Sequence, residues 1–480
     1  MAKILFLTAP YHCGVVEVAG RWPPLTFGYL ATSAKEAGFK PLLYDAMSTG
    51  GGLKDIKKVI EEVKPDIVGL SSITSTIEEN LKIAKIVKNL NKNIKIILGG
   101  VHPSFMFKEI LENNEEIDYI VIGEGEETLK ELLSKLKKDE DISNVKGIAF
   151  KEKDKIISGK RNFLEDLDPL TPSFEIFQWE NYRYFPLKNS RLGAISTSRG
   201  CPHSCTFCSQ QKFWEKNWRG RSPEKVLDEI KLLYKNYGAR VILITDEYPT
   251  KDRQRWEELL KGIISLKFKD LYFLMETRVD DILRDEKILK LYKEAGIIHI
   301  YIGLEAGTQE TLDLIKKETD VQMGKIALDL LHSQGFITET SFVMGLPEED
   351  KKSAKRTLEL AKYYNPDFAH FLCITPWPYS DLYEEVKDFI RVFDYSKYNL
   401  IEPIIEPKKL KLKEVDEIIL KCYRDYYIWK FKNLEKNGFK YNYIIESFKL
   451  IMKSSFIKNK ILKYPDFKRK IFKQFYGFKN

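Results

Sequence analysis

Cysteine is scarce in this 480-residue sequence, and long apolar runs are missing from it. Six cysteines are too few for a disulfide-stapled scaffold, and three of them crowd together, so we expect a reducing compartment. No uninterrupted apolar run approaches the ~20 residues that span a bilayer. The N-terminal stretch MAKILFLTAP has neither the apolar core nor the cleavage site of a signal peptide. These absences predict a cytoplasmic protein without a transmembrane segment.

Most of the chain also has no strong excess of positive or negative charge. The net charge is +8, from 78 basic and 70 acidic residues. Residues 449–480 carry ten Lys or Arg and a single acid, a charge of +9, which leaves the first 448 residues at −1. A near-neutral body gives no indication of a nucleic-acid partner. An apolar content of 43% excludes a disordered chain, and the length predicts two to four domains.

The basic segment at the end of the chain interleaves Lys with Phe, Ile and Leu, as in KSSFIKNKILKYPDFKRKIFKQF. This pattern predicts an amphipathic helix whose basic face is solvated. The alternative is a docking surface for an acidic electron-donor protein or for an anionic membrane.

The first 140 residues alternate strand-like apolar runs with segments that are apolar every three or four residues. The strand candidates are residues 3–9, 40–46, 66–72, 94–100 and 118–124. Apolar strands joined by crossover helices predict an α/β domain with a doubly wound, Rossmann-like parallel sheet. Ligands of such sheets lie at the carboxyl ends of the strands.

Regular alternation stops in residues 141–186, where DLDPLTPSFEIF is rich in Pro, Asp and aromatic residues, and we interpret this segment as a linker packed between domains. Six strand candidates follow within residues 187–399, at 193–200, 241–247, 271–278, 298–307, 338–347 and 368–378. Each lies beside an amphipathic helix, which predicts a partial (βα)6 barrel with its chemistry at the carboxyl ends of the strands. Residues 400–480 are predicted to form a helical C-terminal region that ends in the basic tail.

Three cysteines lie within eight residues in the stretch Cys201-Pro-His-Ser-Cys205-Thr-Phe-Cys208, directly after the first barrel strand. Three thiolates on a short loop can bind three irons of a four-iron cluster and leave the fourth iron open. The alternatives are a zinc site and free thiols. A structural zinc usually has four ligands from paired elements, and the sequence has no second C-x2-C element.

This C-x3-C-x2-C spacing after a strand resembles the radical S-adenosylmethionine (SAM) enzymes. The resemblance implies that Cys201, Cys205 and Cys208 hold a [4Fe-4S] cluster, which binds SAM and cleaves it to a 5′-deoxyadenosyl radical. It also implies SAM contacts beside the last cysteine and at successive strand ends, namely Phe207, Asp246, Glu247, Glu276, Arg278, Gly303, Glu305 and Gly345. The alternative interpretation is that acids at strand ends cap the following helices.

An open α/β domain upstream of such a barrel resembles the cobalamin-binding domain of a large radical SAM class. Glycines at strand ends let the backbone approach a nucleotide tail, and hydroxyls can bond to it. The residues implied are His12, Ser71, Ser72, Ile73, Gly99, Gly100, Val101, His102, Gly123 and Glu124. The Asp-x-His-x-x-Gly pattern of a cobalt-ligating histidine is missing, so we expect no histidine lower ligand. For His12 and His102, loop histidines facing solvent or cofactor are the simpler interpretation.

Long stretches of the chain, including ILGGVHPSFM, LITDEYPT and NPDFAHFLCITPWPYSDLY, resemble the anaerobic magnesium-protoporphyrin IX monomethyl ester oxidative cyclase family. The resemblance implies oxidation of a propionate ester side chain to form the isocyclic ring, with oxygen taken from water. The small-molecule substrate would then be a porphyrin ester, and the electron donor a flavodoxin or ferredoxin. Arg219 and Arg221 are expected to pair with its carboxylate. Aromatic residues expected to cover the macrocycle, or else to be simple packing residues, are Phe213, Trp214, Trp218, Trp377, Tyr379 and Tyr383.

The cofactor motifs leave other functions open. Radical SAM C-methyltransferases share this architecture and use methylcobalamin as the methyl donor. The Lys-, Ile- and Glu-rich composition is typical of a thermophile or an AT-rich genome, and such an organism need not make chlorophyll. A radical RNA-modifying enzyme should carry a basic RNA-binding domain or a second cysteine cluster. A non-catalytic cobalamin sensor would have no use for the three clustered cysteines.

Overall fold

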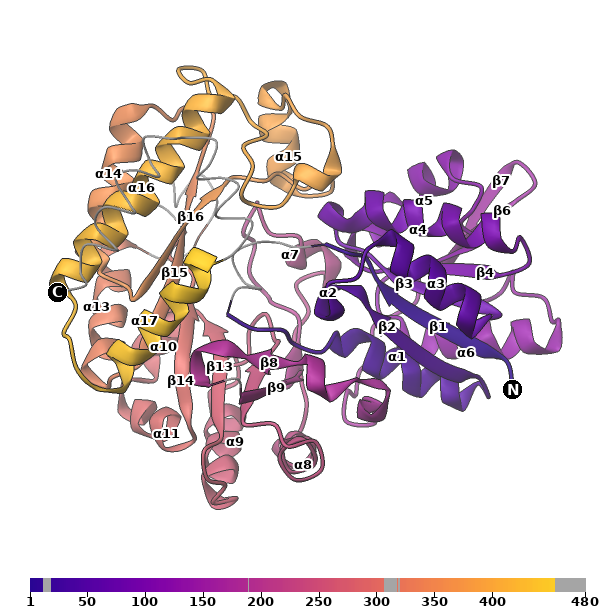
Figure 1. Ribbon diagram of the computed structural model, residues 1–480, viewed down its shortest axis with the longest axis horizontal. Coiled ribbons are helices and arrows are strands. Elements are labelled where there is room, and N and C mark those ends of the chain that lie inside the picture. The colour runs from indigo at the N-terminus through magenta and orange to yellow at the C-terminus, as the bar shows by residue number, and fades with distance from the viewer. Residues whose placement is uncertain (12–18, 189, 306–316, 318–319, 454–480) are drawn as a thin grey trace.

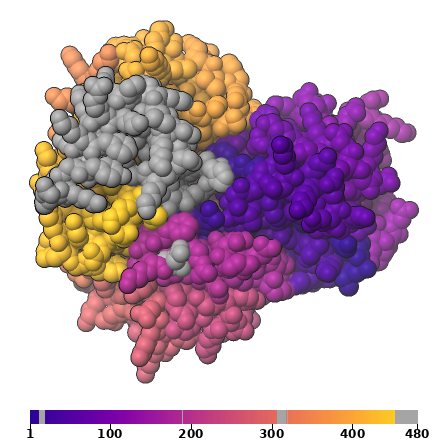
Figure 2. Space-filling model, in the orientation of Figure 1, coloured from indigo at the N-terminus to yellow at the C-terminus, as the bar shows by residue number. Residues whose placement is uncertain are grey.

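The computed structural model describes residues 1–11, 19–188, 190–305, 317 and 320–453, which form two lobes side by side (Figure 1). The N-terminal lobe is drawn in indigo and purple, and the second lobe runs from magenta to yellow. Figure 2 shows that the surfaces of the two lobes meet along a continuous boundary. His12 and residues 454–480 of the basic tail lie outside the described residues.

The N-terminal lobe is built on a sheet with the strand order β2-β1-β3-β4-β5-β6-β7. Its parallel strands are β1 (Lys3–Thr8), β2 (Lys40–Asp45), β3 (Ile67–Ser71), β4 (Lys95–Gly99) and β5 (Tyr119–Val121). Both faces are covered by helices, which are α1 (Leu25–Glu36), α3 (Leu53–Val63), α4 (Ile77–Leu90), α5 (Val101–Asn113) and α6 (Glu126–Lys138). Alternate strand residues enter two separate apolar cores. The predicted doubly wound domain is confirmed.

The N-terminal sheet continues beyond residue 140, where the sequence indicated a linker. Strands β6 (Ile148–Glu152) and β7 (Lys155–Ser158) form an antiparallel hairpin, and β6 pairs with β5. The rest of the segment carries an aromatic cluster of Phe174, Phe177, Trp179 and Tyr182, which packs in the same core as barrel residues. The first part of this segment therefore belongs to the first lobe, and the second part packs between the lobes.

The second lobe contains six parallel strands in chain order, which are β9 (Ser190–Ile195), β12 (Val241–Ile244), β13 (Tyr272–Thr277), β14 (Ile297–Ile302), β15 (Ile337–Met344) and β16 (Phe368–Cys373). A short strand, β8 (Arg183–Tyr184), adds to one edge in the antiparallel sense. The six strands match the predicted partial barrel, which is confirmed. Helices on the outside include α8 (Pro223–Lys235), α9 (Arg253–Ser265), α13 (Val321–Ser333) and α14 (Lys351–Tyr364).

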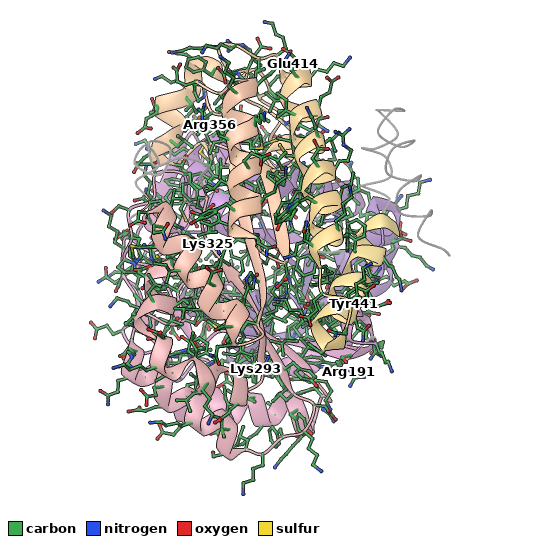
Figure 3. All side chains as sticks on the ribbon, turned by 90° about the vertical axis from the view of Figure 1, so that its left-hand side faces the viewer. Arg191, Lys293, Lys325, Arg356, Glu414 and Tyr441 are labelled. Carbon is green, nitrogen blue, oxygen red and sulfur yellow. The ribbon has the colours of Figure 1, made fainter. Side chains whose placement is uncertain are left out.

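Two C-terminal helices complete the second lobe, α16 (Leu412–Asn433) and α17 (Gly438–Lys453). Figure 3 shows α13, α14, α16 and α17 layered on the outside of the sheet, with Lys325 and Arg356 extending outward from α13 and α14. Tyr443 and Ile444 of α17 pack with residues at the amino ends of the barrel strands. Helix α17 therefore covers the end of the barrel opposite to the carboxyl ends. No helix among the described residues combines the length and the apolarity needed to cross a membrane.

Candidate functional site

The carboxyl ends of the two sheets face each other across a cavity of about 480 Å3. One wall comes from the loops after β3, β4 and β5, and the other from the loops after β9 and β12. Residues of the predicted site that line it are Ser71, Ser72, Ile73, Gly99, Gly100, Val101, Gly123, Glu124 and Glu247. Loops that lie far apart in the sequence thus meet at one site because strand ends of parallel sheets gather at one edge.

The wall formed by the N-terminal lobe is built of small residues and one exposed apolar side chain. Gly100 has a φ of +102°, and a Cβ there would lie 2.5 Å from the carbonyl oxygen of Ser72. The Ser72 amide in turn donates to the carbonyl of Gly99 over 2.8 Å. Ile73 is 52% exposed beside these loops. A loop whose backbone a ligand can approach closely, with an exposed apolar side chain beside it, fits the face of a corrin ring, so the residues present fit cobalamin.

Replacing Gly100 with alanine tests this wall. The positive φ and the clash with Ser72 should cost about 1–3 kcal/mol and displace the loop. We expect cobalamin affinity, measured by absorbance titration, to fall about tenfold or more. The matched control is Gly50→Ala, where φ is +71° but nothing lies within 4 Å of an added Cβ. Equal affinities for the two variants would show that the loop does not contact the ligand.

His102 does not line the cavity, and its side chain connects the two lobes instead. Its Nδ1 lies 3.2 Å from the Thr74 hydroxyl, which is 2.9 Å from the hydroxyl of Tyr379 in the barrel lobe. Burial lowers the pKa of His102 to about 4, so the ring is neutral. Tyr379 also stacks on Phe105 with centroids 4.5 Å apart. Tyr379, expected among the macrocycle-covering residues, thus fixes the loop that carries Ile73.

Glu124 both lines the cavity and joins the lobes. Its two oxygens accept from Arg199 over 2.8 Å and from Arg219 over 2.9 Å, and Arg199 also pairs with Glu126 over 2.6 Å. Burial alone would raise the pKa of Glu124, but the hydrogen bonds and charges of the two arginines lower it below its usual value. We call the set of Arg199, Glu124 and Glu126 the interlobe clamp.

The two arginines expected to bind a substrate carboxylate are buried and already paired. Arg219 is held by Glu124, while Arg221 pairs with Glu229 over 2.7 Å and donates to the carbonyl of Ser196 over 3.1 Å. Both arginines thus have carboxylate partners inside the protein, and pairing with a substrate carboxylate stays a prediction that would require these pairs to open or to be shared.

The aromatic residues expected around the barrel mouth divide into two groups. Phe213 and Trp214 line the cavity. Trp218 donates to the carbonyl of Tyr248 over 2.8 Å, away from the cavity lining. Trp377 and Tyr383 pack in an apolar cluster with Leu346 and Ile374, which also includes the predicted SAM residue Phe207. Only the first two are placed to face a ligand in this cavity.

The cysteine loop lies between β10 (Ser198–Arg199) and α7 (Gln210–Phe213), at the carboxyl end of the first barrel strand. Cys205 is buried, Cys201 and Cys208 are partly buried, and the Cys208 amide donates to the Cys205 carbonyl over 3.1 Å. Burial raises the pKa of Cys208 to about 12 and also raises that of Cys201, so metal binding must displace thiol protons.

The three thiols of this loop suit an iron–sulfur cluster. Each thiolate of a four-iron cluster binds a different iron, so the three sulfurs need not converge on one metal ion. Within the described ranges, no three Cys, His, Asp or Glu side chains form a group that could hold a single metal ion.

Asp246 and Glu247 follow β12 and differ in their roles. Asp246 accepts hydrogen bonds from the Thr197 amide over 2.6 Å and from the Ser198 hydroxyl over 2.7 Å, and burial raises its pKa to about 6. It therefore shapes the turn that leads into the cysteine loop. Glu247 accepts from the Trp214 indole over 2.9 Å and from the Gly200 amide over 3.2 Å, at the cavity wall.

Two further carboxylates face the inside of the barrel. Glu276 on β13 points into the open interior of the barrel, where the protein around it, followed by the charges of Glu247 and Glu305, raises its pKa to about 8. Glu305 lies 3.4 Å from the Lys317 ammonium and accepts from the Ser341 hydroxyl over 3.2 Å. Three neighbouring carboxylates fit a cationic ligand, and SAM carries both a sulfonium and an ammonium group.

The remaining predicted SAM residues lie around the same strand ends. A Cβ on Gly303 would lie 2.7 Å from the Lys317 ammonium, so glycine leaves room for the Lys317–Glu305 pair. Arg278 pairs with Asp280 over 3.0 Å, and its charge also acts on Cys201. Gly345 has a φ of +89°, and its amide donates to Glu349. These residues follow β13, β14 and β15 at the same edge of the sheet at which the cysteine loop follows β9.

Sequence reasoning missed two sets of residues. The interlobe clamp joins GEGEE after β5 to SRG after β9, and a single sequence gives no sign that these loops meet. The second set is His299, Glu339 and His370, three polar residues in the middle of apolar strands. Ionisable residues inside the strand segments IHIYI, TETSF and FAHFL were a signal that could have found them.

Comparisons with known proteins agree with this division of the chain. Residues 11–133 match the family model described as the B12 binding domain, and residues 195–361 match that of the Radical SAM superfamily. The chain is 38% identical over 436 residues to the anaerobic magnesium-protoporphyrin IX monomethyl ester cyclase of Rubrivivax gelatinosus. The aligned region covers 89% of this chain and 78% of that protein. It is 30% identical over 435 residues to an uncharacterized methyltransferase of Pyrococcus horikoshii, over 89% and 92% of the two chains.

Solved structures share the two-lobed fold. The cobalamin-dependent SAM radical enzyme OxsB, with aqua-cobalamin and SAM bound, superimposes with a TM-score of 0.70 at 20% identity over 94% of this chain and 70% of that one. The radical SAM methyltransferase TsrM from Kitasatospora setae gives a TM-score of 0.66 at 18% identity over 81% and 78%. At these identities the likeness concerns the fold.

Proposed function

The chain belongs to the cobalamin-dependent radical SAM family, and we propose that it oxidises a side chain of a magnesium-porphyrin ester to close a ring. The single observation that carries the proposal is the cavity between the two lobes, in which Arg199 and Gln210, on either side of the cysteine loop, face the wall of the N-terminal lobe. A radical generator and a flat cofactor would then act on one substrate from two sides. The likeness to the cyclase over most of the chain supports a porphyrin substrate.

The cavity and the strand ends beside it would hold the three cofactors. Cys201, Cys205 and Cys208 would bind three irons of the cluster. The loops around Ser72, Ile73 and Gly100 would support cobalamin, and the inner-face carboxylates would attract the cationic groups of SAM. When bound, these groups supply a 5′-deoxyadenosyl radical and a one-electron partner for the substrate. The interlobe clamp holds the two walls at a fixed separation.

An anaerobic reconstitution tests the proposal. The full-length protein is loaded with iron, sulfide and cobalamin, and is then incubated with SAM, a reductant and magnesium-protoporphyrin monomethyl ester. We expect 5′-deoxyadenosine and a product that contains the new ring and one oxygen from labelled water, both followed by mass spectrometry. Deoxyadenosine without any change in the porphyrin would contradict the substrate assignment.

Methyl transfer to carbon is the second candidate. The relative from Pyrococcus horikoshii is described as an uncharacterized methyltransferase, and the match covers 92% of its length. The cavity suits both reactions equally. The same experiment separates them, because a methyltransferase adds one methyl group and no oxygen from water.

The electron supply is a further part of the proposal. The cluster needs a low-potential one-electron donor, and a flavodoxin or ferredoxin would serve. A cluster with an open iron is easily oxidised, so the reducing cytoplasm is the location in which this chemistry would persist. Assays with each donor in place of a chemical reductant test this point.

The pH dependence of SAM binding tests the role of Glu276. Its pKa of about 8 means that the group is mostly neutral at pH 7 in the free protein, and a bound cation favours the carboxylate. We expect SAM affinity to rise with pH below 8, by up to about tenfold per pH unit, and to level off above it. Calorimetric titration of the reconstituted enzyme measures this, and Glu276→Gln should flatten the profile. An unchanged profile in that variant would exclude Glu276 from the SAM site.

A further inference from the structure

A polar cluster of His299, Glu339 and His370 lies on the inner face of the barrel, apart from the residues assigned above. The Glu339 carboxylate is bracketed by two imidazoles, with His299 Nε2 at 2.8 Å from one oxygen and His370 Nε2 at 2.5 Å from the other. The three residues come from the adjacent strands β14, β15 and β16. We call them the inner-face triad.

Strand register places the triad directly below the proposed SAM site. Tyr301 pairs in register with Glu339, and Ser341 pairs with His370. Ser341 bonds to Tyr301 over 2.5 Å and to Glu305 over 3.2 Å. Because Ser341 is two residues from Glu339 on one strand, the two layers lie ~7 Å apart. Their neighbours Ile300, Phe342 and Phe371 point to the opposite face, into the core under the helices.

The triad continues toward the covered end of the barrel. His299 Nδ1 lies 2.9 Å from the Tyr443 hydroxyl of α17, which contacts the hydroxyl of Tyr184. Hydrogen bonds thus join His370 to Glu339, and separately His299 to Tyr443 and Tyr184, while His299 Nε2 lies near Glu339 without hydrogen-bond geometry. At the other end, His370 Nδ1 is buried without a hydrogen-bond partner among the described residues. An orphaned buried nitrogen next to an inner face indicates a missing polar partner.

The accessibility of the triad distinguishes it from a structural ion cluster. The Glu339 side chain is 26% accessible, although it lies mid-strand. The buried cluster that anchors α16 and α17 provides the contrast, since Asp367 pairs with Lys430 and Lys440 and is only 1% accessible. An anchoring carboxylate needs no access to the inner face, whereas one that exchanges protons with a ligand does.

We propose that the inner-face triad is the proton acceptor of the oxidation. The inference rests on the proposed function. In that reaction the radical first takes a hydrogen atom from the substrate carbon, which removes one electron. A one-electron oxidant of the corrinoid class then takes a second electron from the same carbon. A water oxygen then bonds to the carbon, one of its O–H bonds breaks, and the released proton moves to His370, whose protonated ring Glu339 stabilises.

The charged surroundings suit this role. Burial would raise the pKa of Glu339, but the charges and hydrogen bonds of the two histidines lower it well below its usual range, so the carboxylate is ionised and can stabilise a protonated imidazole. The titratable groups that face the triad from neighbouring elements, or that its charge reaches, are Glu276, Tyr301, Glu305, Lys317, Tyr184, Tyr423, Tyr427 and Tyr443. Among these, only Lys317 carries a positive charge.

The test compares Glu339→Gln with the wild-type reconstituted enzyme across pH 6 to 9. Deoxyadenosine and porphyrin product are quantified together. Loss of a general base typically costs about 10²–10⁴-fold, so we expect product formation to fall about 100-fold or more while deoxyadenosine formation stays within about twofold. The product rate of the variant should also lose the pH dependence seen at low pH in the wild type. Asp367→Asn is the matched control, and it should lower thermal stability without uncoupling the two products.

Each outcome decides the proposal. Product formation within about threefold of wild type in Glu339→Gln would overturn it. A parallel loss of deoxyadenosine and product would also overturn it, because that pattern indicates structural damage or a role in SAM binding. If the variant does not fold, as judged by iron content and circular dichroism, His370→Gln receives the same test with the same expectations. A wild-type product that carries a methyl group and no water oxygen would instead refute the proposed function itself.

Discussion

Replacing Cys205 with alanine is expected to lower 5′-deoxyadenosine formation by at least about 1,000-fold, because one iron loses its only protein ligand. Cys205 is the most buried thiol of the loop, and it accepts the backbone bond that closes the turn to Cys208. Cobalamin should still bind with unchanged affinity, since its proposed wall lies in the other lobe. Iron and sulfide analysis, the visible absorbance of the cluster and a deoxyadenosine assay measure the three quantities.

The matched control for this variant is Cys422→Ala, because Cys422 is also a buried thiol but lies in α16 within the helical core. It should keep the full cluster content and radical formation. A Cys205→Ala protein that retained four irons and wild-type deoxyadenosine formation would show that the loop does not hold the cluster. Loss of cobalamin together with iron would indicate that the variant disturbs both lobes and not the cluster alone.

The strands were predictable because they are buried on both faces. Runs such as VILI at β12 and IIL within β4 are apolar throughout, and only a sheet covered by helices on both sides accommodates them. The hairpin of β6 and β7 was not predictable by that criterion, because only the first three residues of β6 and none of β7 are buried, and the hairpin lies at a sheet edge. The cysteine loop was found because its spacing is fixed by the cluster and depends on no distant contact.

The partners of charged residues could not be predicted. Arg219 and Arg221 follow the cysteine loop in an aromatic-rich stretch, where pairing with a ligand was a reasonable hypothesis. Their actual partners, Glu124 and Glu229, come from another lobe and from the next helix. A sequence shows which charges exist, but only the packed structure shows which remain uncompensated. The same reasoning applies to His102, whose partner Thr74 meets a tyrosine that is 305 residues away along the chain.

Replacing Arg199 with methionine is expected to have the largest effect on stability. Methionine keeps much of the apolar stem but leaves Glu124 with Arg219 alone and Glu126 without its arginine partner. Removing one member of a buried charge network costs about 3–5 kcal/mol. We expect a large drop in the unfolding midpoint in urea, and weaker cobalamin binding because Glu124 also lines the cavity. The control is Arg161→Met, which breaks a partly exposed pair with Glu131 and should cost about 1 kcal/mol or less.

The pH dependence of the stability difference between wild type and Arg199→Met shows whether the charge of Arg199 causes that difference. The arginines lower the pKa of Glu124 in the folded protein, so its contribution to stability is present above the unfolded value of about 4.3 and is lost as the pH falls below it. The gap in unfolding free energy between wild type and Arg199→Met should therefore be widest near neutral pH and narrow as the carboxylates become protonated. The Arg199 guanidinium also lies over the Tyr29 ring, 5.3 Å from its centre. A difference in unfolding free energy that stayed constant down to pH 4 would mean that Arg199 stabilises the protein by this packing and not by its charge.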